Sequence, residues 1–250
     1  MKIAVCIKRV PDMETRFKIG PSGTAVDEAG LKFDISDFDA YAVEVALQLN
    51  EKSGGGETTV ICLGPDVVQE TIRKALSMGA DRGVQLKSET VPFDGFAIAR
   101  ALTAELSAGS YDLIMFGKHS LDSSQGVVGA TAAELLRLPC VVAASKLEIA
   151  NGKGTARREL EGGAEMLEFP LPAVVTIDEG IARPRYPSLK GIMAAKKKPL
   201  EVRPAQLGDV RLTVGLLEPP AERPPGRIVG QGADAVPELV RLLKTEAKVL

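Results

Sequence analysis

The residues with the clearest chemical potential lie in one loop, rich in glycine and serine, that runs directly into a predicted helix. The loop reads Gly117-Lys118-His119-Ser120-Leu121-Asp122-Ser123-Ser124-Gln125-Gly126-Val127-Val128-Gly129. Backbone N–H groups at a helix start, together with the positive end of the helix dipole, can receive a phosphate group. The same residue types also form ordinary helix caps. The loop alone therefore leaves a phosphate site and a simple capping loop as alternatives.

The motifs of phosphate-hydrolysing and nucleophilic enzymes are missing from the sequence. It has no Gly-x-x-x-x-Gly-Lys-Ser/Thr segment and no Gly-x-Gly-x-x-Gly opening a helix. His119 is the single histidine, which limits general acid-base chemistry, and no Ser-His-Asp or Cys-His arrangement is visible. These features favour binding over bond-making chemistry, and no catalytic residue is predicted.

Two further strand ends and one helix start are expected beside this loop. The first predicted strand ends in Cys6-Ile7-Lys8-Arg9 and the second in Leu63-Gly64-Pro65, and ligands of open α/β sheets bind at such carboxyl ends. Ser36-Asp37-Phe38-Asp39 precedes the first predicted helix, where its acidic groups suit a capping segment. Alternatively, the Phe38 ring could stack on a flavin or an adenine.

A second functional candidate is the segment 183–199, which mixes apolar and basic residues. Tyr186, Leu189, Ile192 and Met193 stand among arginines and lysines. Apolar anchors surrounded by positive charge are typical of a docking surface. From the residues alone, we favour the alternative, a buried helix followed by a solvated basic run.

The elements that must position these residues belong to an α/β fold. Short β-branched runs alternate with amphipathic helical patterns, which indicates a parallel sheet flanked by helices. Strands are predicted at residues 2–7, 58–63, 83–86, 113–116 and 140–143, and hairpins around 20–23 and 151–154. Helices are predicted around residues 42–49, from a cap at Asp66 to Gly79, at 94–106 and at 126–136. Beyond residue 176, frequent prolines, Pro224 among them, predict an extended tail over a partner, with a short helix near 236–243.

Composition indicates a globular protein without a bulk charge for nucleic acid or membranes. Of 250 residues, 45% are hydrophobic and 26% charged, and the net charge is -2. The apolar run at 3–7 is too short for a signal peptide, which predicts a cytoplasmic protein. Cys6, Cys62 and Cys140 are expected to be buried thiols, and no metal site is predicted.

Four segments resemble the β subunit of electron transfer flavoproteins in order and spacing. They are Ile-Lys-Arg-Val-Pro-Asp at 7–12, Gln-Glu-Thr-Ile-Arg-Lys-Ala-Leu at 69–76 with Met-Gly-Ala-Asp-Arg at 78–82, Arg-Glu-Leu-Glu-Gly-Gly-Ala-Glu at 158–165 running into Pro-Leu-Pro-Ala-Val-Val-Thr at 170–176, and Pro-Arg-Tyr at 184–186 with Ile-Met-Ala-Ala-Lys-Lys-Lys at 192–198. The likeness covers most of residues 1–200, and the tail matches only in style.

The resemblance implies a Rossmann-like domain of the adenine nucleotide alpha hydrolase type over residues 1–200, with a recognition loop at 180–198, and an arm over 201–250 that packs on an α subunit. The redox-active FAD would be held mainly by α, with Phe38 and Met13 toward it, and AMP by this chain. The implied nucleotide pocket comprises Cys6, Lys8, Ser36, Asp37, Phe38, Asp39, Leu63, Gly64, Gly117, Lys118, Asp122, Ser123, Ser124, Gln125, Gly126, Val127, Val128 and Gly129.

For partners, the resemblance implies electron transfer from dehydrogenases, such as acyl-CoA dehydrogenases, to a quinone reductase or respiratory chain. Leu189 would be the anchor of a docking surface comprising Arg185, Tyr186, Leu189, Ile192 and Met193. The sequence departs from the family at Gly126-Val127-Val128, where many members carry side-chain donors, and at Met13, where some have an aromatic residue. A second FAD in the pocket, as in the bifurcating branch, or a stand-alone universal-stress-type adenine nucleotide protein remain alternatives.

Overall fold

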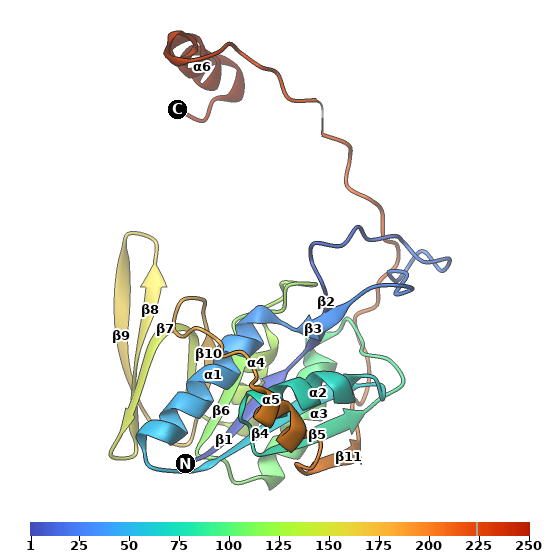
Figure 1. The fold of residues 1–250 in the computed structure, drawn as a ribbon, viewed down its shortest axis with the longest axis vertical. Helices are drawn as coiled ribbons and strands as arrows, with labels where there is room; N and C mark the ends of the chain where they lie inside the picture. Colours follow the sequence, from blue (N-terminus) through green and yellow to red (C-terminus); the bar gives the residue numbers. More distant parts are fainter. Residues whose placement is uncertain (224) are drawn as a thin grey trace. The chain divides into compact units, whose positions relative to one another are not determined.

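The computed structural model describes residues 1–223 and 225–250; Pro224 of the proline-rich tail lies outside them. The chain forms two compact units, Met1–Leu216 and Leu217–Leu250. The first unit is an α/β domain built on one sheet, as the sequence predicted (Figure 1). No helix of the described part is both long and apolar enough to cross a membrane.

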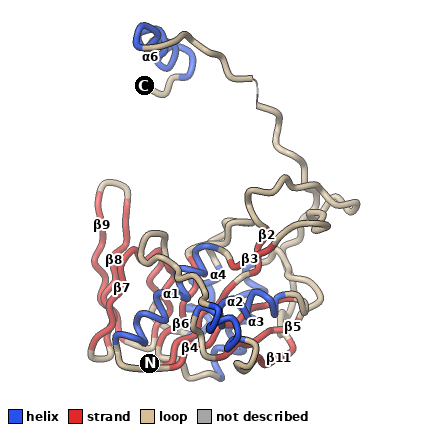
Figure 2. Tube along the Cα trace, in the orientation of Figure 1, coloured by secondary structure: helices blue, strands red, loops and turns tan. Residues whose placement is uncertain are grey.

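The sheet of the first unit is parallel over most of its width. In the described residues its nine strands run in the order β11-β5-β4-β1-β6-β10-β7-β8-β9. Their bounds are β1 Lys2–Ile7, β4 Glu57–Gly64, β5 Arg82–Lys87, β6 Leu113–Gly117, β7 Cys140–Ala150, β8 Lys153–Leu160, β9 Gly163–Pro170, β10 Ala173–Ile177 and β11 Leu200–Pro204. Only the pairs β7–β8 and β8–β9 are antiparallel, and these strands form one end of the sheet (Figure 2).

Helices cover both faces of this sheet. One face carries α1 (Asp37–Lys52), α2 (Val68–Met78) and α5 (Leu189–Ala195), and the other carries α3 (Gly95–Ala108) and α4 (Val128–Leu136). Alternate residues of β1 serve the two cores: Ile3 and Val5 face the first layer, and Ala4 and Cys6 face the second. This alternation follows from the two-residue period of a strand.

The connection after β1 is irregular, as expected. Strands β2 (Arg9–Pro11) and β3 (Phe33–Ile35) form a separate antiparallel pair. Between them, a bridge joins Ile19 and Val26 across the predicted turn. In the second unit, a short 3-10 turn (Ala233–Ala235) leads into α6 (Val236–Leu242), which continues as a π-helix (Leu243–Ala247).

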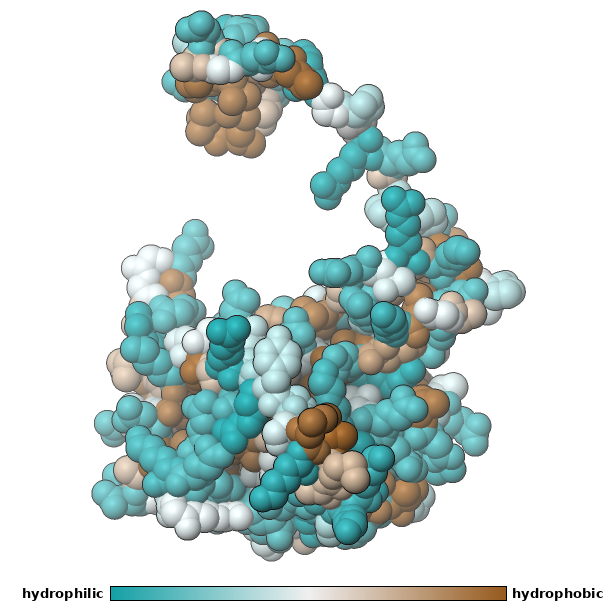
Figure 3. Space-filling view, viewed as in Figure 1, coloured by the Kyte–Doolittle hydropathy of each residue, from teal (hydrophilic) through white to brown (hydrophobic). Residues whose placement is uncertain are grey.

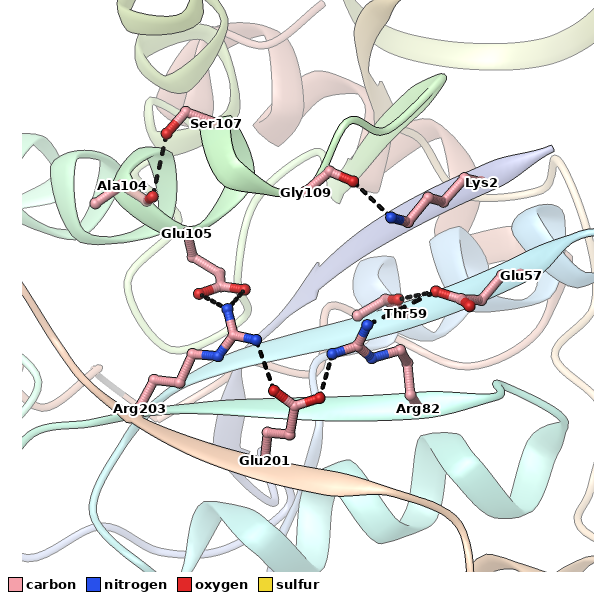
Figure 4. A network of polar contacts seen from close by, with 10 residues as sticks. All are labelled: Lys2, Glu57, Thr59, Arg82, Ala104, Glu105, Ser107, Gly109, Glu201 and Arg203. Carbon is pink, nitrogen blue, oxygen red and sulfur yellow. Dashed lines mark hydrogen bonds and ion pairs between the residues drawn. The ribbon is translucent and has the colours of Figure 1, made fainter.

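Strand β11 extends the first unit past residue 200, where the arm was expected to begin. It pairs with β5 at the edge of the sheet and is held there by ion pairs (Figure 4). Arg203 Nη1 lies 2.7 Å from Glu105 Oε1 on α3, and Arg203 Nη2 lies 2.6 Å from Glu201 Oε2. Glu201 also pairs with Arg82 of β5. The chain therefore leaves the sheet only after Pro204.

Asp94 fixes the segment that follows β11. Its Oδ1 accepts hydrogen bonds from the backbone N–H groups of Phe96 (2.9 Å) and Ala97 (3.3 Å) and so caps α3. Its Oδ2 accepts bonds from the backbone N–H groups of Arg211 (2.7 Å) and Leu212 (3.2 Å). One carboxylate thus joins a helix start to a chain segment more than a hundred residues away.

Two local predictions are wrong. Asp66 does not cap α2, because its carboxylate bonds to Lys87 Nζ (2.8 Å) and Gln85 Nε2 (3.4 Å) on β5, and Val67 occupies the cap position. Cys140 is exposed, whereas Cys6 and Cys62 are buried as expected. Cys140 begins β7, whose residues are less enclosed than those of the central strands. The error for Asp66 arises because its partners are distant in sequence.

Candidate functional site

Asp39 joins the ends of two central strands at the carboxyl edge of the sheet. From the first turn of α1, its Oδ2 accepts a hydrogen bond from the backbone N–H of Lys8 (2.7 Å), just after β1. Its Oδ1 accepts one from the backbone N–H of Gly117 (2.9 Å), the last residue of β6. The approach is so close that a Cβ on Gly117 would lie 2.5 Å from Asp39 Oδ1. Glycine is therefore required there by space.

The Asp39 carboxyl group is 6% exposed, and this burial dominates its ionisation. Burial raises its pKa to about 7, although the two backbone hydrogen bonds and the Lys8 charge favour the ionised form. The group therefore changes charge near neutral pH. A buried carboxyl group with such a pKa is uncommon outside functional sites.

Lys8 reaches from the end of β1 into the loop after β6. Its Nζ forms an ion pair with Asp122 Oδ2 at 2.7 Å and donates to Ser120 Oγ at 3.3 Å. A longer contact of 3.5 Å leads to Ser123 Oγ, which is itself 3.0 Å from Ser120 Oγ. The Lys8 ammonium group therefore gathers the predicted residues Asp122 and Ser123, together with Ser120 of the same loop.

Helices α4 and α1 both begin at this edge without a side-chain cap. Helix α4 follows Val127, and within the described chain no hydrogen-bond partner is found for the backbone N–H groups of Val128, Gly129 and Ala130. Helix α1 follows Ser36, whose hydroxyl forms no cap and is buried without a partner. Open N–H groups at helix starts suit an anionic ligand, because the helix dipole adds positive potential. The donors therefore suit an anionic group such as a phosphate.

The predicted loop rests on the start of α3. Gln125 Nε2 donates to the carbonyl oxygen of Phe93 at 2.7 Å. A Cβ on Gly95 would lie 2.6 Å from Val127 Cγ2, so the two segments touch. Gly126 has a φ of 65°, a left-handed conformation that suits glycine in the turn. The start of α3 therefore holds the loop in place, and the sequence alone did not predict this contact.

Apolar and aromatic residues form the base of the site. Cys6, Leu63 and Leu86 belong to one buried cluster, and burial raises the pKa of the Cys6 thiol well above its ordinary value. Cys6 therefore offers an apolar surface rather than a thiolate. The Phe38 ring packs edge-on against His119, with ring centroids 4.4 Å apart. Phe38 is 9% exposed, so most of its ring already has protein neighbours.

Not every predicted pocket residue joins this arrangement. Lys118 donates its backbone N–H to Ile177 (2.8 Å), and its ammonium group pairs with Asp178 at 2.9 Å, beyond the end of β10. Its ammonium group therefore lies toward β10, which neighbours β6 on the side opposite β1. Conversely, His119 and Ser120 contact the site although neither was singled out. Both residues lie within the predicted loop, and that position could have identified them as site residues.

The predicted docking residues lie on a short exposed helix, α5, and just before it. Tyr186 is 90% exposed, Leu189 83% and Met193 63%, and apolar surface gathers over α5 (Figure 3). The expectation of a buried helix is wrong, since Ala195 is its only buried residue. The helix nevertheless sits firmly on α2, because a Cβ on Gly191 would lie 2.6 Å from the carbonyl oxygen of Ser77. Arg185 differs from these residues, because it bonds to α1.

Comparisons with known proteins find a matching family and relatives that are similar over the whole chain. The family described as the electron transfer flavoprotein domain matches residues 23–207. The β subunit of electron transfer flavoprotein from Bacillus subtilis is 36% identical over 262 residues, covering 100% of both chains. The β subunit from Bradyrhizobium diazoefficiens is 37% identical over 250 residues, covering 100% of both. The human β subunit is 36% identical over 253 residues, covering 100% of this chain and 99% of the human one.

Proposed function

The chain belongs to the electron transfer flavoprotein family, β-subunit branch, and from this premise we propose that it pairs with an electron transfer flavoprotein α subunit as a heterodimeric electron carrier. The observation that carries the proposal is similarity to β subunits along the full length of the chain. In the proposed role, the heterodimer receives electrons from dehydrogenases, such as the acyl-CoA dehydrogenases of fatty acid β-oxidation. It passes them to a quinone reductase or the respiratory chain, in the cytoplasm.

We assign the strand-end site to an adenine nucleotide, with AMP as the expected ligand. The open N–H groups of α4 and the Lys8 ammonium group would face its phosphate, and the buried Cys6 and Leu63 would form an apolar base. Gly126-Val127-Val128 offers no side-chain donor, so recognition would rest on the backbone, Ser123 and Ser124. A second FAD in this pocket is the alternative ligand.

FAD, held mainly by the α subunit, would supply the electron-accepting group. In this proposal the chain binds the nucleotide, helps to orient the flavin and docks the dehydrogenase. No bond-making step is assigned to its residues. Met13 is exposed, and Phe38 lies nearly covered at the start of α1. On this proposal, Met13 is the more accessible of the two side chains expected toward the flavin.

The exposed surface around α5 is the proposed docking site for a dehydrogenase. Tyr186, Leu189, Ile192 and Met193 provide the apolar contact. Lys190, Lys196 and Lys197 are exposed around them, so the partner should offer an apolar pocket with an acidic rim. Apolar anchors supply most of the binding energy in such contacts, and charge mainly accelerates encounter.

The second unit is the proposed contact with the α subunit. Its helix α6 leaves Val236, Leu239 and Val240 exposed, although they recur at the spacing of one helix face. Such a face is stable when a partner covers it. In this proposal residues 217–250 pack on α, and residues 205–216 remain attached to the first unit.

Co-expression with the α subunit tests this function. The purified complex should be yellow, and acid release should yield more adenine than flavin if AMP occupies the strand-end site. Equal amounts of adenine and flavin would instead indicate a second FAD. A colourless chain that does not bind α would refute the proposal.

The docking site has its own test. Leu189→Ala should raise the KM of the heterodimer for an acyl-CoA dehydrogenase about tenfold or more, because a central apolar anchor typically contributes at least ~2 kcal/mol. Flavin content should be unchanged. If the variant loses FAD, the surface around α5 belongs to the subunit interface instead.

A further inference from the structure

Arg185 immediately precedes Tyr186 of the docking surface. Most of its guanidinium N–H groups donate to side chains of its own chain. Its Nε donates to Glu44 Oε2 at 2.8 Å and its Nη2 to Glu44 Oε1 at 2.9 Å, a bidentate pair. Its Nη1 donates to Glu51 Oε1 at 2.6 Å and its Nη2 to Glu51 Oε2 at 3.1 Å. The backbone N–H of Arg185 adds a bond of 3.2 Å to Glu44 Oε2. Little donor capacity remains for an external partner.

The acceptors of these bonds are built into helix α1. Glu44 and Glu51 are two helical turns apart, so they lie on one face of α1. The Glu44 side chain is only 4% exposed. Burial alone would raise the Glu44 pKa, but hydrogen bonds from Arg185 and Gln48 outweigh it, and the pKa falls below its ordinary value. An ionised, enclosed carboxylate with a bidentate arginine is a geometrically specific anchor.

The far end of the same segment is anchored to helix α2. Arg73 Nη1 donates to the carbonyl oxygens of Ala195 (2.6 Å) and Lys198 (2.7 Å). Lys198 Nζ in turn donates to the carbonyl oxygens of Leu76 (3.0 Å) and Ala80 (2.6 Å), at the end of α2. Charge-assisted bonds therefore hold residues 185 and 195–198, while the apolar side chains between them stay exposed.

We propose that Arg185 is a positioning residue for docking: by clamping the start of the loop to Glu44 and Glu51, it presents Tyr186 and Leu189 in a fixed arrangement to the dehydrogenase. This inference rests on the proposed docking function of the surface around α5. Arg185 itself does not enter the partner. Ordering these side chains before encounter removes part of the entropy cost of binding, so the clamp acts on the affinity for the dehydrogenase.

The test compares Arg185→Met with Arg183→Met in the complete heterodimer. Methionine keeps an aliphatic stem and removes every guanidinium donor. Arg183 is exposed and has no hydrogen bond or ion pair within the described part of the chain, so it controls for the lost charge. Arg185→Met should raise the KM for an acyl-CoA dehydrogenase about tenfold, equivalent to the loss of pre-ordering of two or three side chains. The kcat at saturating dehydrogenase and the flavin content should not change.

Hydrogen exchange of residues 186–194 gives a second readout that does not depend on electron transfer. In the wild type, the amides of Gly191 and Ile192 are bonded to Ser188, and their exchange should accelerate in Arg185→Met but not in Arg183→Met. Because Arg185→Met leaves Glu44 enclosed without its partner, the double variant Arg185→Met with Glu44→Gln is measured in parallel. It should show the same KM increase with restored folding.

The outcomes separate the clamp from the docking surface. Unchanged exchange, or faster exchange with an unchanged KM, would overturn the positioning role of Arg185. Equal effects of Arg185→Met and Arg183→Met would also overturn it, because the effect would then reflect charge alone. Failure of the docking proposal has a different signature, since Leu189→Ala would then leave the KM unchanged as well.

Discussion

Replacing Asp39 with asparagine should remove the pH dependence of stability that its buried carboxyl group imposes between its ordinary pKa of 3.8 and about 7. The buried carboxyl group has a pKa of about 7 in the folded chain against an ordinary value of 3.8. Its protonated form is therefore preferred on folding, and the stability that this group contributes is complete below pH 3.8 and is lost as the pH rises to about 7.

The size of the effect follows from the pKa difference. The rise in pKa from 3.8 to about 7, at ~1.36 kcal/mol per pKa unit, corresponds to about 4 kcal/mol. Asparagine carries no charge, but its amide nitrogen cannot accept a hydrogen bond, so one of the two backbone N–H donors of Lys8 and Gly117 loses its acceptor. The Asp39→Asn variant should therefore be less stable than the wild type near pH 4, by about 1–3 kcal/mol for the buried N–H donor left without an acceptor. As the pH rises above 7, the difference in unfolding free energy should shift in favour of the variant by up to about 4 kcal/mol.

Urea unfolding of the full-length chain from pH 4.5 to pH 8 provides the measurement. All other titrating groups are shared, so their contributions cancel when the unfolding free energies of the two proteins are subtracted. The difference should grow with pH and level off above the pKa of Asp39. A difference that stays constant across this range would refute the reasoning, because burial would then not control the ionisation of Asp39.

Two further perturbations test contacts at the site and at the arm. Lys8→Met should weaken AMP binding to the nucleotide-free heterodimer at least about tenfold, since a hydrogen bond to a charged group contributes ~1.5–3 kcal/mol. Titration calorimetry measures this affinity. Lys118→Met is the control and should bind AMP normally, because Lys118 pairs with Asp178 instead. Asp94→Asn should keep one oxygen to cap α3 but lose the acceptor for the backbone N–H groups of Arg211 and Leu212. Residues 205–216 should then become sensitive to limited proteolysis. An unchanged digestion pattern would contradict the anchoring role of Asp94.

Local patterns predicted the elements that carry the site. The strand at Lys2–Ile7 was predicted with its observed bounds, and Asp94 begins α3 where the sequence placed the helix start. These predictions succeeded because side-chain periodicity and capping depend on residues within a few positions of each other. The prediction for Asp66 failed for the converse reason, since its partners Gln85 and Lys87 lie on another strand.

The sequence by itself determined the α/β class and the family, and it predicted the strand ends that form the proposed ligand site. Only the tertiary structure decided how these segments meet: Asp39 bridges Lys8 and Gly117, Lys8 pairs with Asp122, and Arg185 clamps onto α1. It also showed that the apolar side chains around Leu189 are exposed, where the residues alone had favoured a buried helix. The physical reason is that burial and ion pairing are properties of chain segments brought together from distant positions, and no local pattern encodes which partner each charge will find.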